Sequence, residues 1–193
     1  MRGAKEAATP CVKQDHGDSS RDELLDDAGY RLARTVGGIC LYLAVDRYDV
    51  KYAVKEASKT FHAPTQETLR RLKRIGRWLL HHRRCVWLYR WQEPGLEFHC
   101  WVDSDHAGTD DAERRSTSGG FLTRGPHPLV DWSSQQSTTA LSSAEAEFNA
   151  LVKGIIELLF AQNLVAWFED DQISKGALYT DSTAGHAMIS RLV

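Results

Sequence analysis

The apolar residues of this chain change their spacing near Gly95, and this change constrains the fold more than any other feature. Before it they recur every three or four residues, as Val50, Val54 and Phe61 do, which is the period of an amphipathic helix. Over residues 96–103 apolar and polar side chains alternate instead, which is the period of a half-buried strand. The chain is therefore expected to be an α/β protein with a helical first part.

The helices of the first part follow from this period and from its interruptions. Residues 1–28 show no apolar period and are expected to be a flexible lead-in. Two helices fit residues 30–61, parted near 46–49, and a third begins after Thr65, whose hydroxyl can cap free backbone N–H groups. We therefore divide the chain into the lead-in 1–28, a helical segment 29–92 and a domain 93–193.

The second part is predicted to form a mixed sheet. Strands are expected at 96–102, 119–123, 129–132 and 176–179. The second and third are predicted to be antiparallel neighbours of the first. Between the third and fourth strands, Ser142 and Glu145 have the spacing of a capping box, which predicts a long amphipathic helix.

Three carboxylates stand where ligands gather in open α/β sheets. Asp103 closes the first strand, Asp181 closes the last, and Glu147 lies in the first turns of the long helix, while Glu145 is assigned to the cap. Two carboxylates 4 Å apart repel by about 4 kcal/mol at an effective dielectric of 20, so such a cluster favours a divalent cation. Oxygen ligands select magnesium or manganese. Alternatively, each acid only solvates a strand end or favours a helix N-terminus.

Positive charge concentrates in residues 67–91, where Glu67 is the single acid. The basic residues are Arg70, Arg71, Lys73, Arg74, Arg77, Arg83, Arg84 and Arg90, and they are interleaved with Trp78, Trp87 and Trp91. We predict that Arg70, Arg74 and Arg77 bind nucleic-acid phosphates without sequence preference. The alternative is a solvated helix face with the tryptophans in the core.

Other site classes find no support in the sequence. The cysteines at 11, 40, 85 and 100 have no Cys-x-x-Cys spacing, so free thiols are expected. The serines around Ser137 have no histidine and acid in a recognisable triad arrangement. We see neither an uninterrupted apolar run of about 20 residues nor a signal sequence, so we expect an intracellular protein, cytoplasmic or nuclear, without a membrane segment.

Four strings resemble the ribonuclease H domain of copia-type retrotransposon polyproteins. They are WVDSDHAG (101–108), RRSTSGGFL (114–122), VDWSSQQSTTALSSAEAEFNAL (130–151) and LYTDSTAG (178–185). Residues 35–65 look like the stretch that links reverse transcriptase to that domain. The resemblance implies a ribonuclease H-like mixed sheet with flanking helices, a two-magnesium site, and hydrolysis of the RNA strand of RNA/DNA hybrids. It also implies the reverse transcriptase portion of the same polyprotein as a partner.

By position, the resemblance assigns Asp103, Glu147 and Asp181 as catalytic metal ligands, and Asp105 is not expected to touch the metal. The family's domain continues through another strand and a final helix with a fourth metal-binding aspartate. We therefore expect the domain to be C-terminally truncated at Val193 and the chain to be a poor nuclease. Two alternatives stay open: a catalytically inactive nucleic-acid-binding remnant, and an unstable fragment.

Overall fold

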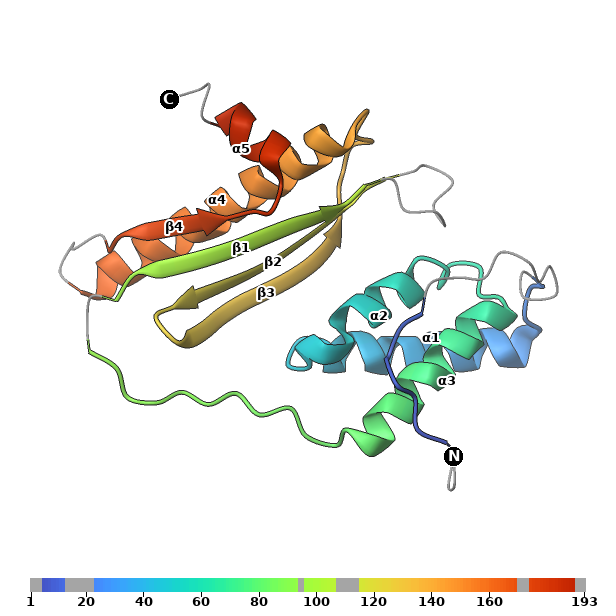
Figure 1. Cartoon of the computed structure of the whole chain (residues 1–193). Coiled ribbons are helices and arrows are strands. Elements are labelled where there is room, and N and C mark those ends of the chain that lie inside the picture. Colours follow the sequence, from blue (N-terminus) through green and yellow to red (C-terminus); the bar gives the residue numbers. More distant parts are fainter. Residues whose placement is uncertain (1–4, 13–22, 94–95, 107–114, 170–173, 190–193) are drawn as a thin grey trace. The chain divides into compact units, whose positions relative to one another are not determined.

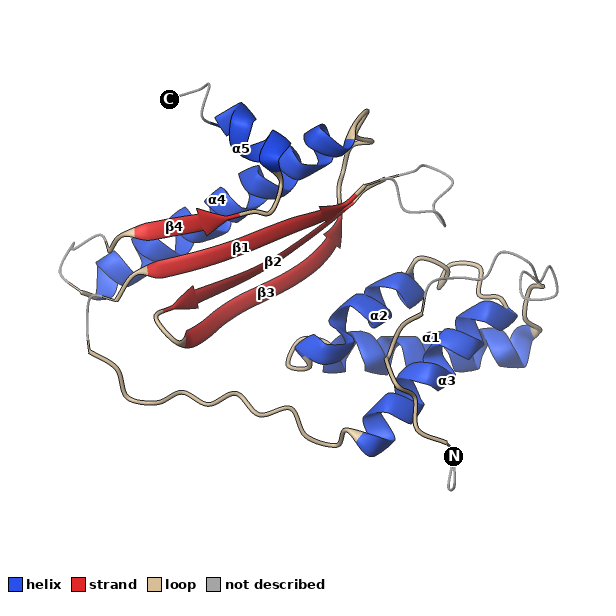
Figure 2. Ribbon diagram, viewed as in Figure 1, coloured by secondary structure: helices blue, strands red, loops and turns tan. Residues whose placement is uncertain are grey.

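The computed structural model describes residues 5–12, 23–93, 96–106, 115–169 and 174–189. The chain divides into two compact units, Met1–Val86 and Trp87–Val193. The described helices of the first unit, and the sheet with its helices in the second, are shown in Figures 1 and 2. The predicted order, helices first and a mixed α/β arrangement after them, is confirmed.

The described residues of the first unit form three helices, as predicted: α1 (Asp27–Leu43), α2 (Tyr48–Ser58) and α3 (Gln66–His81). The side chain of Asp26 caps α1 by accepting from the backbone N–H of Gly29 at 2.8 Å. Thr65 caps α3 in a reciprocal arrangement with Thr68. Small and branched side chains from all three helices form one core: Ala33, Cys40, Ala44, Val50, Ala53, Val54, Ala57, Leu72 and Ile75.

A carboxylate ties the start of α2 to the end of α3. Asp49 accepts two hydrogen bonds from the guanidinium of Arg47, at 2.8 and 2.7 Å, and one from the indole N–H of Trp78 at 2.7 Å. Arg47 also donates to the backbone carbonyl of His82 at 2.8 Å. The bond from Arg47 holds the pKa of Asp49 below its usual value, which keeps this link charged.

Part of the predicted lead-in packs on this unit. Ala7 is buried, and the side chain of Cys11 contacts the helical core. Leu24 forms an isolated antiparallel bridge with Thr65, next to the cap of α3. Residues 1–4 and 13–22 of the predicted lead-in lie outside the described residues.

The second unit is a four-stranded mixed sheet of order β3-β2-β1-β4, a ribonuclease H-like arrangement. Its strands are β1 (Phe98–Asp105), β2 (Thr117–Arg124), β3 (His127–Gln135) and β4 (Gly176–Tyr179). β1 pairs antiparallel with β2 and parallel with β4. β3 pairs with β2, so the prediction that it would also neighbour β1 is wrong. The tight turn at Gly125 brings β3 to the outer edge of β2, and β4 takes the other side of β1.

The helix α4 (Ser143–Phe168) lies along one face of the sheet, and α5 (Thr183–Ile189) follows β4 (Figure 1). Alternate side chains of β1, namely Phe98, Cys100 and Val102, are buried beneath α4 and form a core with Leu122 and Leu151, among others. Gly154 permits the close approach. A Cβ atom there would lie 2.5 Å from a methyl carbon of Val102.

The outer side of α4 exposes large apolar residues: Ile156, Leu159, Phe160, Leu164, Trp167 and Phe168. Within the part of the chain that the structure describes, α4 is the one helix long and apolar enough, by length and composition, to cross a membrane. A core helix passes the same test, and the inner side of α4 packs on the sheet. The absence of a membrane segment stays a prediction.

We predict that Gly154→Ala lowers the free energy of unfolding by about 1–3 kcal/mol, because the new methyl group overpacks the contact between α4 and β1. The matched control in the same unit is Gly119→Ala. Its Cβ would meet nothing closer than 3.9 Å, so we expect no loss and a gain of up to about 1 kcal/mol. Urea denaturation of both variants measures the difference, and equal stabilities would contradict the close contact at Gly154.

Candidate metal centre

The register between β1 and β4 places two aspartates side by side. The parallel pairing ends with Trp101 opposite Tyr179. Asp103 follows Trp101 by two residues, and Asp181 follows Tyr179 by two residues. β4 ends at Tyr179, so Asp181 lies just beyond the strand. Asp181 therefore lies beside Asp103, at a level of β1 where no other described strand pairs on that side. Asp103 lies inside β1, which continues to Asp105, and not at its end as predicted.

The third carboxylate comes from the first turns of α4. Ser142 is the N-cap of this helix, and its hydroxyl accepts from the backbone N–H of Glu145 at 3.2 Å. The buried amide of Gln136 donates to the backbone carbonyl of Ala146 at 2.8 Å and to the hydroxyl of Ser118 at 2.9 Å. These bonds tie the first turn of α4 to β2, and they fix the backbone next to Glu147.

The three carboxylates converge, as the sequence predicted. One carboxylate oxygen from each of Asp103, Glu147 and Asp181 lies within 4.8 Å of the other two. The two aspartates are exposed and Glu147 is half-buried. One carboxylate oxygen of Glu147 is buried and has no hydrogen-bond partner among the described residues. The cluster is therefore open to solvent on one side and has an unsatisfied acceptor on the other.

The electrostatics of the cluster are unfavourable without a cation. Burial raises the pKa of Glu147, and the neighbouring carboxylates of Asp103 and Asp181 raise it further, while Ser104 opposes the rise. Like charges held close together disfavour ionisation, and a bound cation reverses this effect.

The donor set fits a hard divalent cation. Two oxygens bound to one magnesium ion at about 2.1 Å lie at most about 4.2 Å apart, slightly less than the 4.8 Å limit found here. Small side-chain rotations would close the set, and the unpartnered oxygen of Glu147 would gain a partner. The role of the three residues as ligands and catalysts stays a prediction.

The neighbouring acids behave differently from these three. The carboxylate of Glu145 accepts from the backbone N–H of Leu141 at 2.7 Å, so it serves the helix start as predicted. Its partner is Leu141 and not Ser142, which corrects the expected capping box, because the carboxylate reaches back one residue further. Asp105 is exposed and lies outside the cluster, in agreement with the sequence analysis.

The predicted phosphate-binding arginines lie in the other unit. Arg70, Arg74 and Arg77 all project from α3 and line a cavity there. Their role in binding nucleic acid stays a prediction. Sequence reasoning missed Gln136, because a glutamine in a run of serines, threonines and glutamines carries no periodic signal.

Comparison with known proteins finds relatives among plant retroelement sequences. The chain is 34% identical over 150 residues to the retrovirus-related Pol polyprotein from transposon RE1 of Arabidopsis thaliana, covering 76% of this chain and 10% of the polyprotein. It is 33% identical over 170 residues to that from transposon RE2 of the same plant, covering 86% and 11%. An uncharacterized mitochondrial protein of this plant is 30% identical over 165 residues, covering 83% and 65%.

The chain thus spans about a tenth of the length of the two polyproteins, to which it is distantly similar. No protein-family model matches the chain, and no solved structure matches it significantly.

We predict that Glu147→Gln stabilises the metal-free chain at neutral pH. A carboxyl group whose pKa is raised in the folded state stabilises the fold at low pH, where it is protonated. This stabilisation is lost as the pH rises from 4.5, the pKa of the group in the unfolded chain, through the raised pKa of the folded state. Glutamine does not ionise, so the Glu147→Gln variant does not lose this stability as the pH rises. Urea denaturation in EDTA at pH 4 and pH 7 should show a gain relative to wild type that grows with pH.

The matched control for this prediction is Glu157→Gln, which removes a carboxylate from α4 outside the cluster. We expect a smaller change with pH in the control. A Glu147→Gln variant whose stability follows the wild type at both pH values would contradict the repulsion described above.

Proposed function

We propose that the second unit is a ribonuclease H-like domain of a retrotransposon polyprotein that hydrolyses the RNA strand of RNA/DNA hybrids. The observation that carries this proposal is the convergence of Asp103, Glu147 and Asp181 within 4.8 Å, at one end of a ribonuclease H-like sheet. The similarity to two retrovirus-related Pol polyproteins supports the retroelement origin.

The three carboxylates would hold magnesium, or manganese, in this proposal. The bound ions would activate a water for attack on phosphorus and stabilise the leaving 3′ oxygen. Asp103 and Asp181 are exposed, so a phosphodiester can approach them from solvent. Glu147 anchors the buried side, because α4 holds its backbone against the sheet. The 2′-hydroxyls and the A-like minor groove of the hybrid would distinguish RNA from DNA.

We predict that magnesium binds the wild-type chain and raises its melting temperature. Asp103→Asn and Asp181→Asn should abolish this shift, because each variant removes a charged ligand. Asp105→Asn is the matched control, since it changes an exposed aspartate two residues away on β1. Thermal unfolding and calorimetric titration with magnesium and manganese measure the effect. An equal shift in Asp103→Asn and the wild type would exclude the cluster as the metal site.

We also predict slow, magnesium-dependent cleavage of a labelled RNA/DNA hybrid. Asp103→Asn should reduce the rate by about 100-fold or more, because metal-ion catalysis contributes several kcal/mol and each 1.4 kcal/mol is about a factor of ten. Asp105→Asn should cleave at the wild-type rate. Hybrid binding without any cleavage by the wild type would instead favour a catalytically inactive nucleic-acid-binding remnant.

A further inference from the structure

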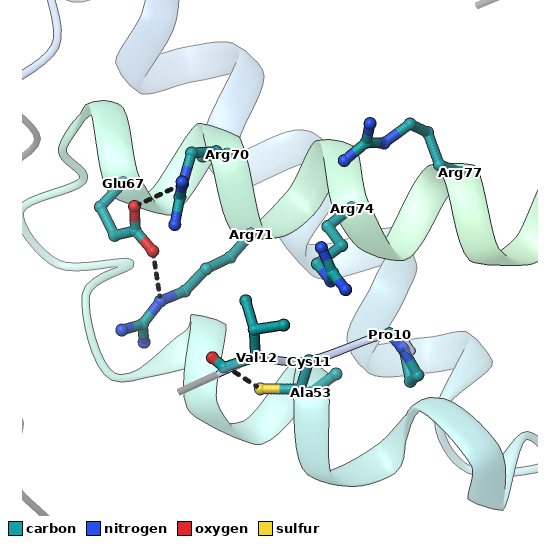
Figure 3. Close-up of a pocket in the computed structure, with 9 residues that line it drawn as sticks. All are labelled: Pro10, Cys11, Val12, Ala53, Glu67, Arg70, Arg71, Arg74 and Arg77. Carbon is teal, nitrogen blue, oxygen red and sulfur yellow. Dashed lines mark hydrogen bonds and ion pairs between the residues drawn. The ribbon is translucent and has the colours of Figure 1, made fainter. Parts of the chain in front are cut away.

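The helical unit contains a cavity of about 120 Å³ whose wall is dominated by arginine. Figure 3 shows the arginines of this wall projecting from α3. The lining residues are Pro10, Cys11, Val12, Ala53, Glu67, Arg70, Arg71, Arg74 and Arg77. Glu67 is the one acid among these lining residues, so the wall carries a clear excess of positive charge.

The single acid of the wall is already engaged by two of the arginines. Glu67 is buried, and its carboxylate accepts from Arg70 at 2.8 Å and from Arg71 at 3.3 Å. Arg71 also donates to the backbone carbonyl of Glu56 at 3.1 Å. Among the described residues, the other two arginines of the wall, Arg74 and Arg77, therefore have no carboxylate as an ion-pair partner.

The remaining two arginines are less fully satisfied. Arg74 donates to the backbone carbonyl and the hydroxyl of Thr9, at 2.8 and 3.2 Å, and both of these acceptors are neutral. The Nε atom of Arg77 is buried and has no hydrogen-bond partner among the described residues. A buried donor left unsatisfied costs free energy, and an anionic acceptor would remove that cost.

The cysteine in the wall supplies no negative charge. Burial raises the pKa of the Cys11 thiol, and nearby Glu56 adds to the rise, while Arg71 and Arg74 oppose it. The thiol therefore stays neutral at pH 7 and does not offset the positive charge of the wall.

We propose that this pocket binds a phosphate group, with Arg77 and Arg74 as its principal ligands. A guanidinium group matches phosphate oxygens with paired N–H donors. The phosphate can belong to a nucleic-acid backbone or be free. The site uses none of the carboxylates of the metal centre, so it goes beyond the proposed nuclease function and can be tested separately.

The test is calorimetric titration of the full chain with inorganic phosphate and with pyrophosphate, at constant ionic strength in EDTA. Arg77→Gln removes the incompletely bonded guanidinium, and we expect affinity to fall about tenfold, which corresponds to about 1.4 kcal/mol. Arg77→Lys keeps the charge without the paired donors, so its phosphate affinity should lie between that of the wild type and that of Arg77→Gln. Lys73→Gln is the matched control, because Lys73 is exposed on α3 and does not line the cavity.

A second titration, with a labelled RNA/DNA hybrid in EDTA, distinguishes the two sources of phosphate. Loss of hybrid affinity in Arg77→Gln but not in Lys73→Gln supports a backbone phosphate. Loss of phosphate or pyrophosphate affinity alone supports a free anion. If Arg77→Gln matches Lys73→Gln with every probe while circular dichroism shows both folded, the pocket is not a phosphate site and the proposal is wrong. A wild-type chain that binds none of the three probes overturns it equally.

Discussion

The contact between α4 and β1 is the interaction on which the second unit depends. Phe98, Cys100 and Val102 are buried beneath the helix, and Gly154 lets the helix approach the strand closely. This contact fixes the distance between a helix and a strand that each carry one acid of the cluster. Apolar burial therefore places charged groups together that would otherwise repel each other.

The parallel pairing of β1 with β4 supplies the other half of the site. It requires the chain to cross over through α4 before it returns beside β1. The same crossover that buries the apolar core thus brings Asp181 beside Asp103. Core and acidic cluster have one structural cause, and the electrostatic cost of the cluster is offset by the burial that creates it.

The helical unit uses its charges in a different way. Asp49 is satisfied by Arg47 and Trp78, and this link joins α2 to α3. In the cavity, by contrast, the arginines of the wall outnumber their one carboxylate, Glu67. Charge in this unit is thus divided between a satisfied structural link and a pocket wall with an excess of positive charge.

The sequence by itself predicted the helices and the strands, because apolar period and capping residues act over a few positions. It also placed three acids at strand ends and at a helix start, while their assignment as metal ligands came from the resemblance to a known family. The prediction that β3 would pair with β1 was wrong, because β3 pairs with β2. Strand pairing depends on which free edge of the sheet a later segment occupies. Sequence reasoning also missed Gln136 and the arginine cavity around Cys11. Those features join residues far apart in the chain, so only tertiary packing decides which donors meet an acceptor. Nε of Arg77 meets none among the residues that the structure describes.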